Sequence, residues 1–243
     1  MSQSMLLFTP ADEIERRIRA VQETMSETGY DGLLIVHHTN LFYYSGTSQD
    51  AVLFIPSSGT PLLMAKRSYE RARKESAVSD IVKLTSLKDM HGMIRSHCGR
   101  PVRRLGLELD VIPVNIFQFY KDVLFKEVSL EDASSLFRKI RAVKSKYEID
   151  LLKTAAKVLD SAFSRVPTWL APGMAEVELA SLFEGHMRKN GYSGVCQVRA
   201  FDRDLFFGNL VSGSSGAEPS YFDGPVNGSG LTPANHPHGA GWK

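Results

Sequence analysis

The sequence is poor in cysteine and has no long hydrophobic run. Its two cysteines in 243 residues, Cys98 and Cys196, lie far apart in the chain. This spacing argues against a disulfide framework or a zinc knuckle and favours a reducing compartment. No stretch approaches the roughly 18 apolar residues of a membrane span, and the N-terminal MSQSMLLFTPADEIERR lacks the basic segment of a signal peptide. We therefore expect a cytoplasmic protein with no membrane partner.

A large excess of charge of either sign is also missing. The chain has 29 Lys and Arg against 27 Asp and Glu, which gives a formal net charge of +2. Such a balance creates no field that would favour nucleic acid or an anionic lipid surface. We therefore expect no nucleic-acid partner.

The first half of the chain alternates between helical and extended patterns. ADEIERRIRAVQETMSETG places apolar residues at helical spacing and ends at a glycine, and DGLLIVHH predicts a short buried strand. Further helices alternate with strands predicted in AVLFIPSSGTPLLMAK, IVKLTS, RRLGLEL and KEVSL. This order predicts an α/β domain with a mixed sheet over residues 1–130.

The second half is mainly helical. EDASSLFRKIRAVKSKYEIDLLKTAAKVLDSAFSRVPTWL has a helical pattern with a break near Val143–Ser145, and PGMAEVELASLFEGHMRKNGY predicts another helix. CQVRAF and FFGNLVSG then predict strands. We expect a linker helix over 131–145 and the incomplete beginning of a second domain over 146–243.

Four stretches of this chain, taken in order, carry a family resemblance. They are DGLLIVHHTNLFYYSG (31–46), RKIRAVKSKYEIDLLKTAAKVLDSAF (138–163), LAPGMAEVELASLFEGHMRKNGYSG (170–194), and the segment 212–239 with its SG, GAEP and PHG. Together they resemble the pita-bread metallopeptidase and creatinase family, which includes Xaa-Pro aminopeptidase, prolidase and creatinase. The resemblance implies a creatinase-like N-terminal α/β domain with a mixed sheet, followed by the first part of a pita-bread α+β catalytic domain.

The chain departs from the family pattern at the start of the helix near Glu176. The family usually carries Thr or Ser before this glutamate, whereas this chain has Ala175. Alanine has no hydroxyl that could accept a hydrogen bond from a free N–H group. We therefore expect Glu176 to serve the helix start by its charge alone.

Two histidines, His236 and His238, stand in a Gly- and Pro-rich segment after the insertion SYFDGPVNGSGLTPAN. The family places a histidine that contacts substrate after Pro and often before Gly, so the resemblance implies His238 as the catalytic residue. Its imidazole would donate to the substrate carbonyl or to the oxyanion that forms from it. The insertion leaves the choice between His236 and His238 open. His236 is a candidate for substrate binding, and so is Asp202, because the family's loops near that position border the substrate cleft.

The complete family enzyme holds two divalent metal ions, Mn, Co or Zn, bound by residues that lie C-terminal to the Pro-His segment. After Gly208 the acidic residues are Glu218 and Asp223, which supply too few carboxylates for a dinuclear metal site. We therefore assign no metal ligand and expect that the chain as given holds no cofactor and is inactive.

The resemblance implies that the complete enzyme cleaves a peptide bond next to proline, in a proline-containing peptide, and that it is a homodimer. Two alternatives stay open. One is a non-catalytic dimerisation or binding module, and the other is a creatinase-like, metal-independent amidino hydrolase that uses His238. For His37 and His38, at the end of a predicted strand, capping or packing is a better explanation than catalysis.

Overall fold

The computed structural model describes residues 8–194, 198–199, 208–219 and 231, and these form two compact units. The first unit contains the described residues up to Lys144 together with Arg199. The second begins at Ser145 and contains the other described residues.

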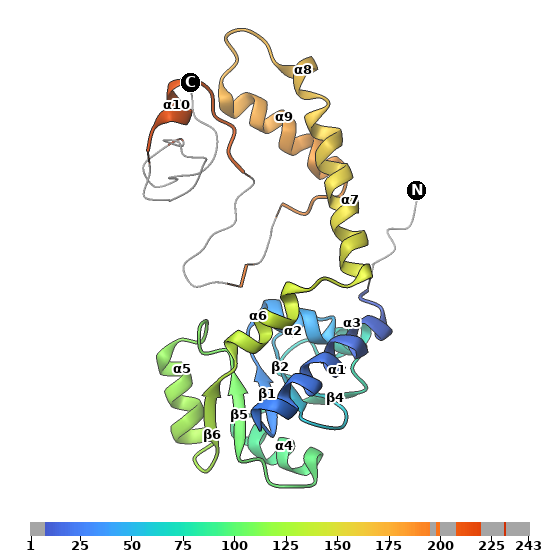
Figure 1. Ribbon diagram of the computed structural model, residues 1–243, viewed down its shortest axis with the longest axis vertical. Helices are drawn as coiled ribbons and strands as arrows, with labels where there is room; N and C mark the ends of the chain where they lie inside the picture. The colour runs from blue at the N-terminus through green and yellow to red at the C-terminus, as the bar shows by residue number, and fades with distance from the viewer. Residues whose placement is uncertain (1–7, 195–197, 200–207, 220–230, 232–243) are drawn as a thin grey trace. The chain divides into compact units, whose positions relative to one another are not determined.

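A six-stranded mixed sheet forms the centre of the first unit, in the order β4-β3-β2-β1-β5-β6 (Figure 1). The strands are β1 (Gly32–Ile35), β2 (Ala51–Pro56), β3 (Leu62–Ala65), β4 (Asp80–Lys83), β5 (Arg104–Leu107) and β6 (Ser129–Asp132). Strand β2 is antiparallel to β1 and β3, whereas the other neighbouring pairs are parallel. The predicted α/β fold with a mixed sheet is therefore confirmed.

Helices cover both faces of this sheet, as Figure 1 shows. One face packs against α1 (Ala11–Thr28), α2 (His38–Ser45), α3 (Tyr69–Glu75) and α6 (Ser134–Ala142). The other packs against α4 (Met90–Cys98), preceded by the short turn η1 (Leu87–Asp89), and against η2 (Tyr120–Leu124), which continues α5 (Val114–Phe119). Strands between two helical layers must be apolar on both faces, and β1, β2 and β3 are buried along their whole length.

Helix α1 shows how the local pattern produces this packing. Ile14, Ile18, Val21 and Met25 recur at helical spacing and are all buried against the sheet. Burying an aliphatic side chain of this size stabilises the fold by about 1.5–3 kcal/mol. The helix ends at Gly29, whose φ of 72° lies in the left-handed region that favours glycine. Both the helix and its predicted end are confirmed.

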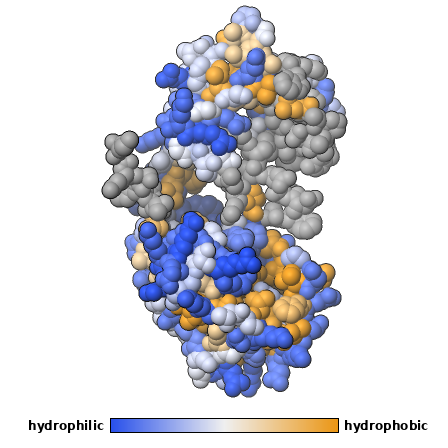
Figure 2. All heavy atoms as spheres, turned by 180° about the vertical axis from the view of Figure 1, so that it is seen from behind, coloured by the Kyte–Doolittle hydropathy of each residue, from blue (hydrophilic) through white to orange (hydrophobic). Residues whose placement is uncertain are grey.

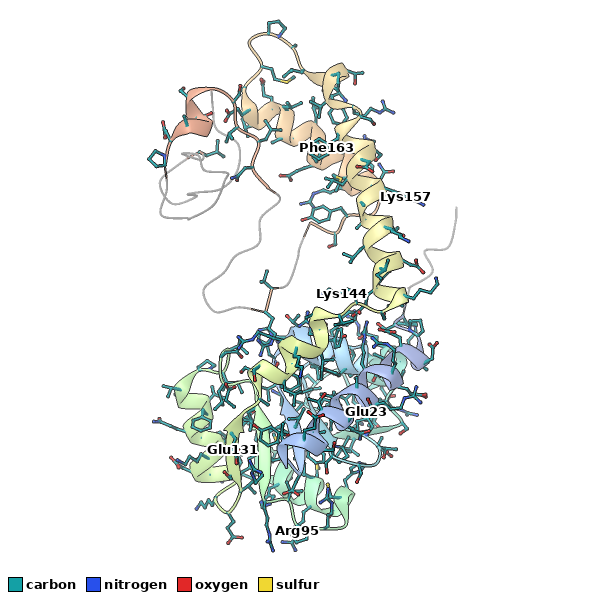
Figure 3. The ribbon with its side chains drawn as sticks, viewed as in Figure 1. Glu23, Arg95, Glu131, Lys144, Lys157 and Phe163 are labelled. Atoms are coloured by element: carbon teal, nitrogen blue, oxygen red, sulfur yellow. The ribbon has the colours of Figure 1, made fainter. Side chains whose placement is uncertain are left out.

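The second unit contains α7 (Lys146–Phe163), α8 (Val166–Trp169), α9 (Glu176–Lys189) and α10 (Ser214–Ala217). The predicted break near Val143–Ser145 is confirmed, because α6 ends at Ala142 and Ser145 caps α7. Ser145 Oγ accepts from the Glu148 N–H at 3.1 Å, and Glu148 Oε2 accepts from the Ser145 N–H at 2.7 Å. Helices α7 and α9 meet where the ring of Phe163 (Figure 3) contacts that of Phe183, with centroids 5.1 Å apart.

The strand predicted in FFGNLVSG is wrong for its described part, residues 208–213, which have no regular structure. Gly208 and Gly213 have φ values of 130° and 57°, which interrupt an extended backbone at both ends. Figure 2 shows hydrophobic residues on the surface of both units. Even so, no helix in the described ranges is both long and apolar enough to cross a bilayer.

Candidate functional site

The candidate residues from the sequence, His236, His238 and Asp202, lie outside the described residues. Their assignment to catalysis and substrate binding therefore stays a prediction. The structure places buried polar residues in both units, and one cluster in each unit is centred on a buried glutamate.

The cluster of the first unit centres on Glu108, which directly follows β5 and is fully buried. Its Oε2 accepts hydrogen bonds from the backbone N–H groups of Val36 and His37, at 3.1 and 3.0 Å. Its Oε1 accepts from Asn40 Nδ2 at 2.6 Å. The neighbouring strands β1 and β5 are parallel, so their carboxyl ends meet at one edge of the sheet. Glu108 therefore ties the start of α2 to β5.

Asn40 extends this network to the end of α6. Its side-chain oxygen accepts from Arg141 Nη1 at 2.7 Å, and the Arg141 guanidinium also lies 5.1 Å from the centre of the Tyr43 ring. A second guanidinium, that of Arg17, lies 3.9 Å from the same ring. The amide of Asn40 thus has a fixed orientation, with its N–H₂ group toward Glu108 and its oxygen toward Arg141.

Arg199 joins this cluster from a distant part of the sequence. Its Nη1 and Nη2 donate to the two carboxylate oxygens of Asp110, both at 2.7 Å. Its Nε lies 3.7 Å from Glu108 Oε1, which is an electrostatic contact and too long for a hydrogen bond. The guanidinium therefore faces two carboxylates and binds one of them in the bidentate geometry that Arg favours.

Burial and charge act against each other in this cluster. Burial raises the pKa of Glu108, although the hydrogen bonds from His37, Val36 and Asn40 and the charge of Arg199 oppose the rise. Burial also disfavours the charged form of Asp110. There, the hydrogen bonds and charge of Arg199 prevail, and the pKa of Asp110 is lowered. The lowered value makes Asp110 the firmly ionised partner of Arg199.

His37 belongs to this cluster as a helix cap. Its Nδ1 accepts from the Thr39 N–H at 3.3 Å at the start of α2. Burial lowers the pKa of His37, and the positive charge of Arg199 acts in the same direction. A neutral imidazole with an accepting Nδ1 suits capping, which confirms the structural interpretation of this histidine. Because Glu108, Asn40 and Asp110 all bond to groups of the unit itself, the cluster acts as an internal brace.

The cluster of the second unit centres on Glu176, at the first position of α9. Its Oε1 accepts from the Ser212 N–H and from the Ser215 hydroxyl. That Glu176 serves the helix start by its charge stays a prediction, and the structure adds hydrogen-bond partners outside the helix. The carboxylate binds a distant segment, while Glu178 accepts from the Ala175 N–H at 2.8 Å and completes the helix start.

A serine and a histidine also meet between α7 and α9. Ser161 Oγ lies 3.0 Å from His186 Nε2, and the Trp169 ring lies 5.7 Å from the imidazole. Ser161 Oγ also lies 2.7 Å from the Val158 carbonyl oxygen. The contact joins α7 and α9, and which of Ser161 and His186 donates depends on the tautomer of the imidazole.

Sequence reasoning missed Glu108 and Arg199. Glu108 carries a weak signal, since it is an acidic residue inside the otherwise apolar LGLEL. Arg199 carries none, because its partners are 89 residues or more away in the chain. Across the ranges that the structure describes, no group of three His, Cys, Asp or Glu residues could hold a metal ion. These residues thus do not form the dinuclear metal site that the resemblance implies for the complete enzyme.

Comparison with known families gives a match to the Creatinase/Prolidase N-terminal domain over residues 17–143. Among curated proteins, an uncharacterized peptidase of Bacillus subtilis, YqhT, is 26% identical over 182 residues, covering 72% of this chain and 49% of its own length. An Xaa-Pro dipeptidase of Pyrococcus horikoshii is 25% identical over 182 residues, covering 74% of this chain and 50% of its own length.

A solved structure, the Xaa-Pro dipeptidase from Bacillus anthracis, superimposes with a TM-score of 0.67 at 24% identity. The match covers 74% of this chain and 50% of that one, and it shows that the two share a fold. The chain spans about half the length of the curated relatives that it matches.

Proposed function

This chain belongs to the Creatinase/Prolidase N-terminal domain family, and from that premise we propose that the whole protein is an Xaa-Pro peptidase of the prolidase or aminopeptidase P type. The reaction is hydrolysis of a peptide bond next to proline. The substrate is a proline-containing peptide.

The observation that carries this proposal is the extent of the similarity. The alignments with YqhT and with the Pyrococcus dipeptidase each span 182 residues, whereas the N-terminal domain match ends at residue 143. The likeness therefore extends beyond the N-terminal domain. The capping box of Ser145 and Glu148 supports it as well, because it starts α7 within residues 138–163, one of the stretches that carry the family resemblance.

In this proposal the residues of the first unit act as a scaffold. The Glu108 carboxylate orients Asn40, and Asn40 holds Arg141 at the end of α6. These two hydrogen bonds therefore fix the end of α6, the last helix of the first unit. Divalent metal ions, Mn, Co or Zn, are expected in the complete enzyme, where they would supply the activated water. The described residues hold no site for them, so we assign this part of the chain no step of the reaction.

The assay is peptide hydrolysis by the purified whole protein, with an Xaa-Pro dipeptide and the matched Xaa-Ala dipeptide as substrates. We expect cleavage of the Xaa-Pro peptide in the presence of Mn²⁺, Co²⁺ or Zn²⁺, little cleavage of the Xaa-Ala peptide, and loss of activity after chelation. A folded protein that cleaves neither peptide with any of these ions would refute the proposal. Metal-independent hydrolysis of a guanidino compound would favour the creatinase-like alternative.

The proposal includes a homodimer in the cytoplasm. Sedimentation equilibrium of the whole protein tests the assembly, and a monomer at micromolar concentration would contradict it. Fractionation of the source cells tests the location, with recovery in the cytoplasmic fraction as the expected result.

A further inference from the structure

Glu176 is only 5% exposed, although it is an acidic residue in the first turn of a helix. Acidic side chains in such positions usually remain in water, where they interact favourably with the helix dipole. The Glu176 carboxylate instead accepts hydrogen bonds from the Ser212 N–H and the Ser215 hydroxyl, which lie 36 and 39 residues further along the chain. Its position thus calls for an explanation other than helix stability.

The segment that it binds is folded around this carboxylate. Ser215 is 1% exposed, and Gly213 has a φ of 57°, which lets the chain turn between the two serines. The Ser212 N–H and the Ser215 hydroxyl both donate to this carboxylate, and the Ser215 oxygen also lies 2.8 Å from the Ser212 carbonyl oxygen. A buried donor that loses its acceptor costs about 1–3 kcal/mol. Glu176 therefore holds Ser212–Ala217 through two donors.

A different carboxylate caps the start of α9. Glu178, two residues later, accepts from the Ala175 N–H at 2.8 Å, and this bond satisfies a free donor at the helix end. The two neighbouring acids thus have separate partners. Glu178 serves its own helix, and Glu176 binds the distant segment.

We propose that Glu176 is a positioning residue that fixes the backbone of Ser212–Ala217 in the second unit. The functional meaning of this segment rests on the proposed function, because the segment lies within residues 212–239, one of the stretches that carry the family resemblance. The fixing itself is a property of the second unit and can be measured without substrate or metal.

The test is amide hydrogen exchange, followed by mass spectrometry, on the whole 1–243 chain without added metal. In Glu176→Ala we expect peptides that cover 211–217 to exchange about tenfold faster or more, as after loss of the acceptor of two buried hydrogen bonds. Peptides from α7 should keep their protection. Glu176→Gln should exchange nearly as the unmodified chain does, because the amide oxygen can still accept from both donors.

Glu178→Ala is the matched control, since it removes an acid from the same helix turn without touching the Ser212 segment. It should leave exchange at 211–217 unchanged. If Glu176→Gln exchanged as fast as Glu176→Ala, the charge at the helix end would be responsible and the positioning role would be wrong. Unchanged exchange at 211–217 in Glu176→Ala would overturn it as well, and so would an equal effect of Glu178→Ala.

Glu176→Ala could also unfold the second unit, which would appear as lost protection in α7 and α9 together. Ser215→Ala then decides, because it keeps the carboxylate and removes one of its donors. We expect faster exchange confined to 211–217, and no change there would overturn the proposal. Since no arm of this experiment measures hydrolysis, its failure is distinguishable from a failure of the proposed peptidase function.

Discussion

Replacement of Glu108 by alanine tests the brace of the first unit most directly. The substitution removes the acceptor of three hydrogen bonds, those from Val36 N–H, His37 N–H and Asn40 Nδ2. Each buried donor left without a partner costs about 1–3 kcal/mol, although water that enters the vacated space recovers part of this. Arg199 keeps its two bonds to Asp110. We therefore expect Glu108→Ala to lower the free energy of unfolding by about 3 kcal/mol.

The assay is urea unfolding followed by far-UV circular dichroism. Hydrogen exchange of peptides that cover β1 and β5 reports on the first unit alone. The matched control is Glu127→Ala, at an exposed acid of the same unit, which should change the stability by no more than about 0.5 kcal/mol. The stability of Glu108→Gln should fall between those of Glu108→Ala and Glu127→Ala. Its amide N–H₂ must face donors in either orientation, those of Asn40 or those of Val36 and His37.

A loss in Glu108→Ala no larger than that of Glu127→Ala would refute the reasoning. It would mean that the three donors find equally good partners once the carboxylate is gone. A large loss that is equal in Glu108→Ala and Glu108→Gln would show that the charge facing Arg199 matters more than the hydrogen bonds.

Three further predictions concern other parts of the fold. Ser145→Ala removes the side-chain half of the capping box and should destabilise the start of α7 by about 1 kcal/mol, which hydrogen exchange of its first turn will show. Burial raises the pKa of Glu108 above the ordinary 4.5, so the folded state binds this proton more tightly than the unfolded state. The resulting stabilisation is complete below pH 4.5 and is lost as the pH rises through the raised pKa. Urea unfolding at a series of pH values should show this loss of stability, and the loss should be smaller in Glu108→Gln. Gly106→Ala would place a methyl group 2.5 Å from Leu33 Cδ2 and should cost about 1–3 kcal/mol in urea unfolding. Gly92→Ala, with no atom within 4 Å of the added carbon, should be neutral or stabilising by up to about 1 kcal/mol.

Each of these has a contradicting result. Unchanged exchange at the start of α7 in Ser145→Ala would show that the remaining contacts hold the helix end. Stability that rises with pH above 4.5, and does so less in Glu108→Gln, would reverse the sign assigned to Glu108. Equal losses of stability in Gly106→Ala and Gly92→Ala would mean that Leu33 moves away from the added methyl group at no cost in free energy.

Several features of this chain were predictable from neighbouring residues alone. The burial of Ile14, Ile18 and Val21, the end of α1 at Gly29 and the break before α7 were all expected and are all confirmed. In each case the information is local, because helical spacing and capping involve residues within a few positions of one another. The mixed sheet followed in the same way from the order of strands and helices.

The two polar clusters, in contrast, were decided by tertiary structure. Glu108 bonds to residues 68 to 72 positions away, Arg199 to an acid 89 positions away, and Glu176 to serines 36 and 39 positions away. No local pattern distinguishes these side chains from acids and arginines on a solvated surface, because their roles arise only when burial removes water and leaves a distant partner. The sequence alone thus predicted the mixed sheet of the first unit, helix α1 with its end, and the family. Only the tertiary structure decided which buried carboxylates in each unit bind residues that are distant in the sequence.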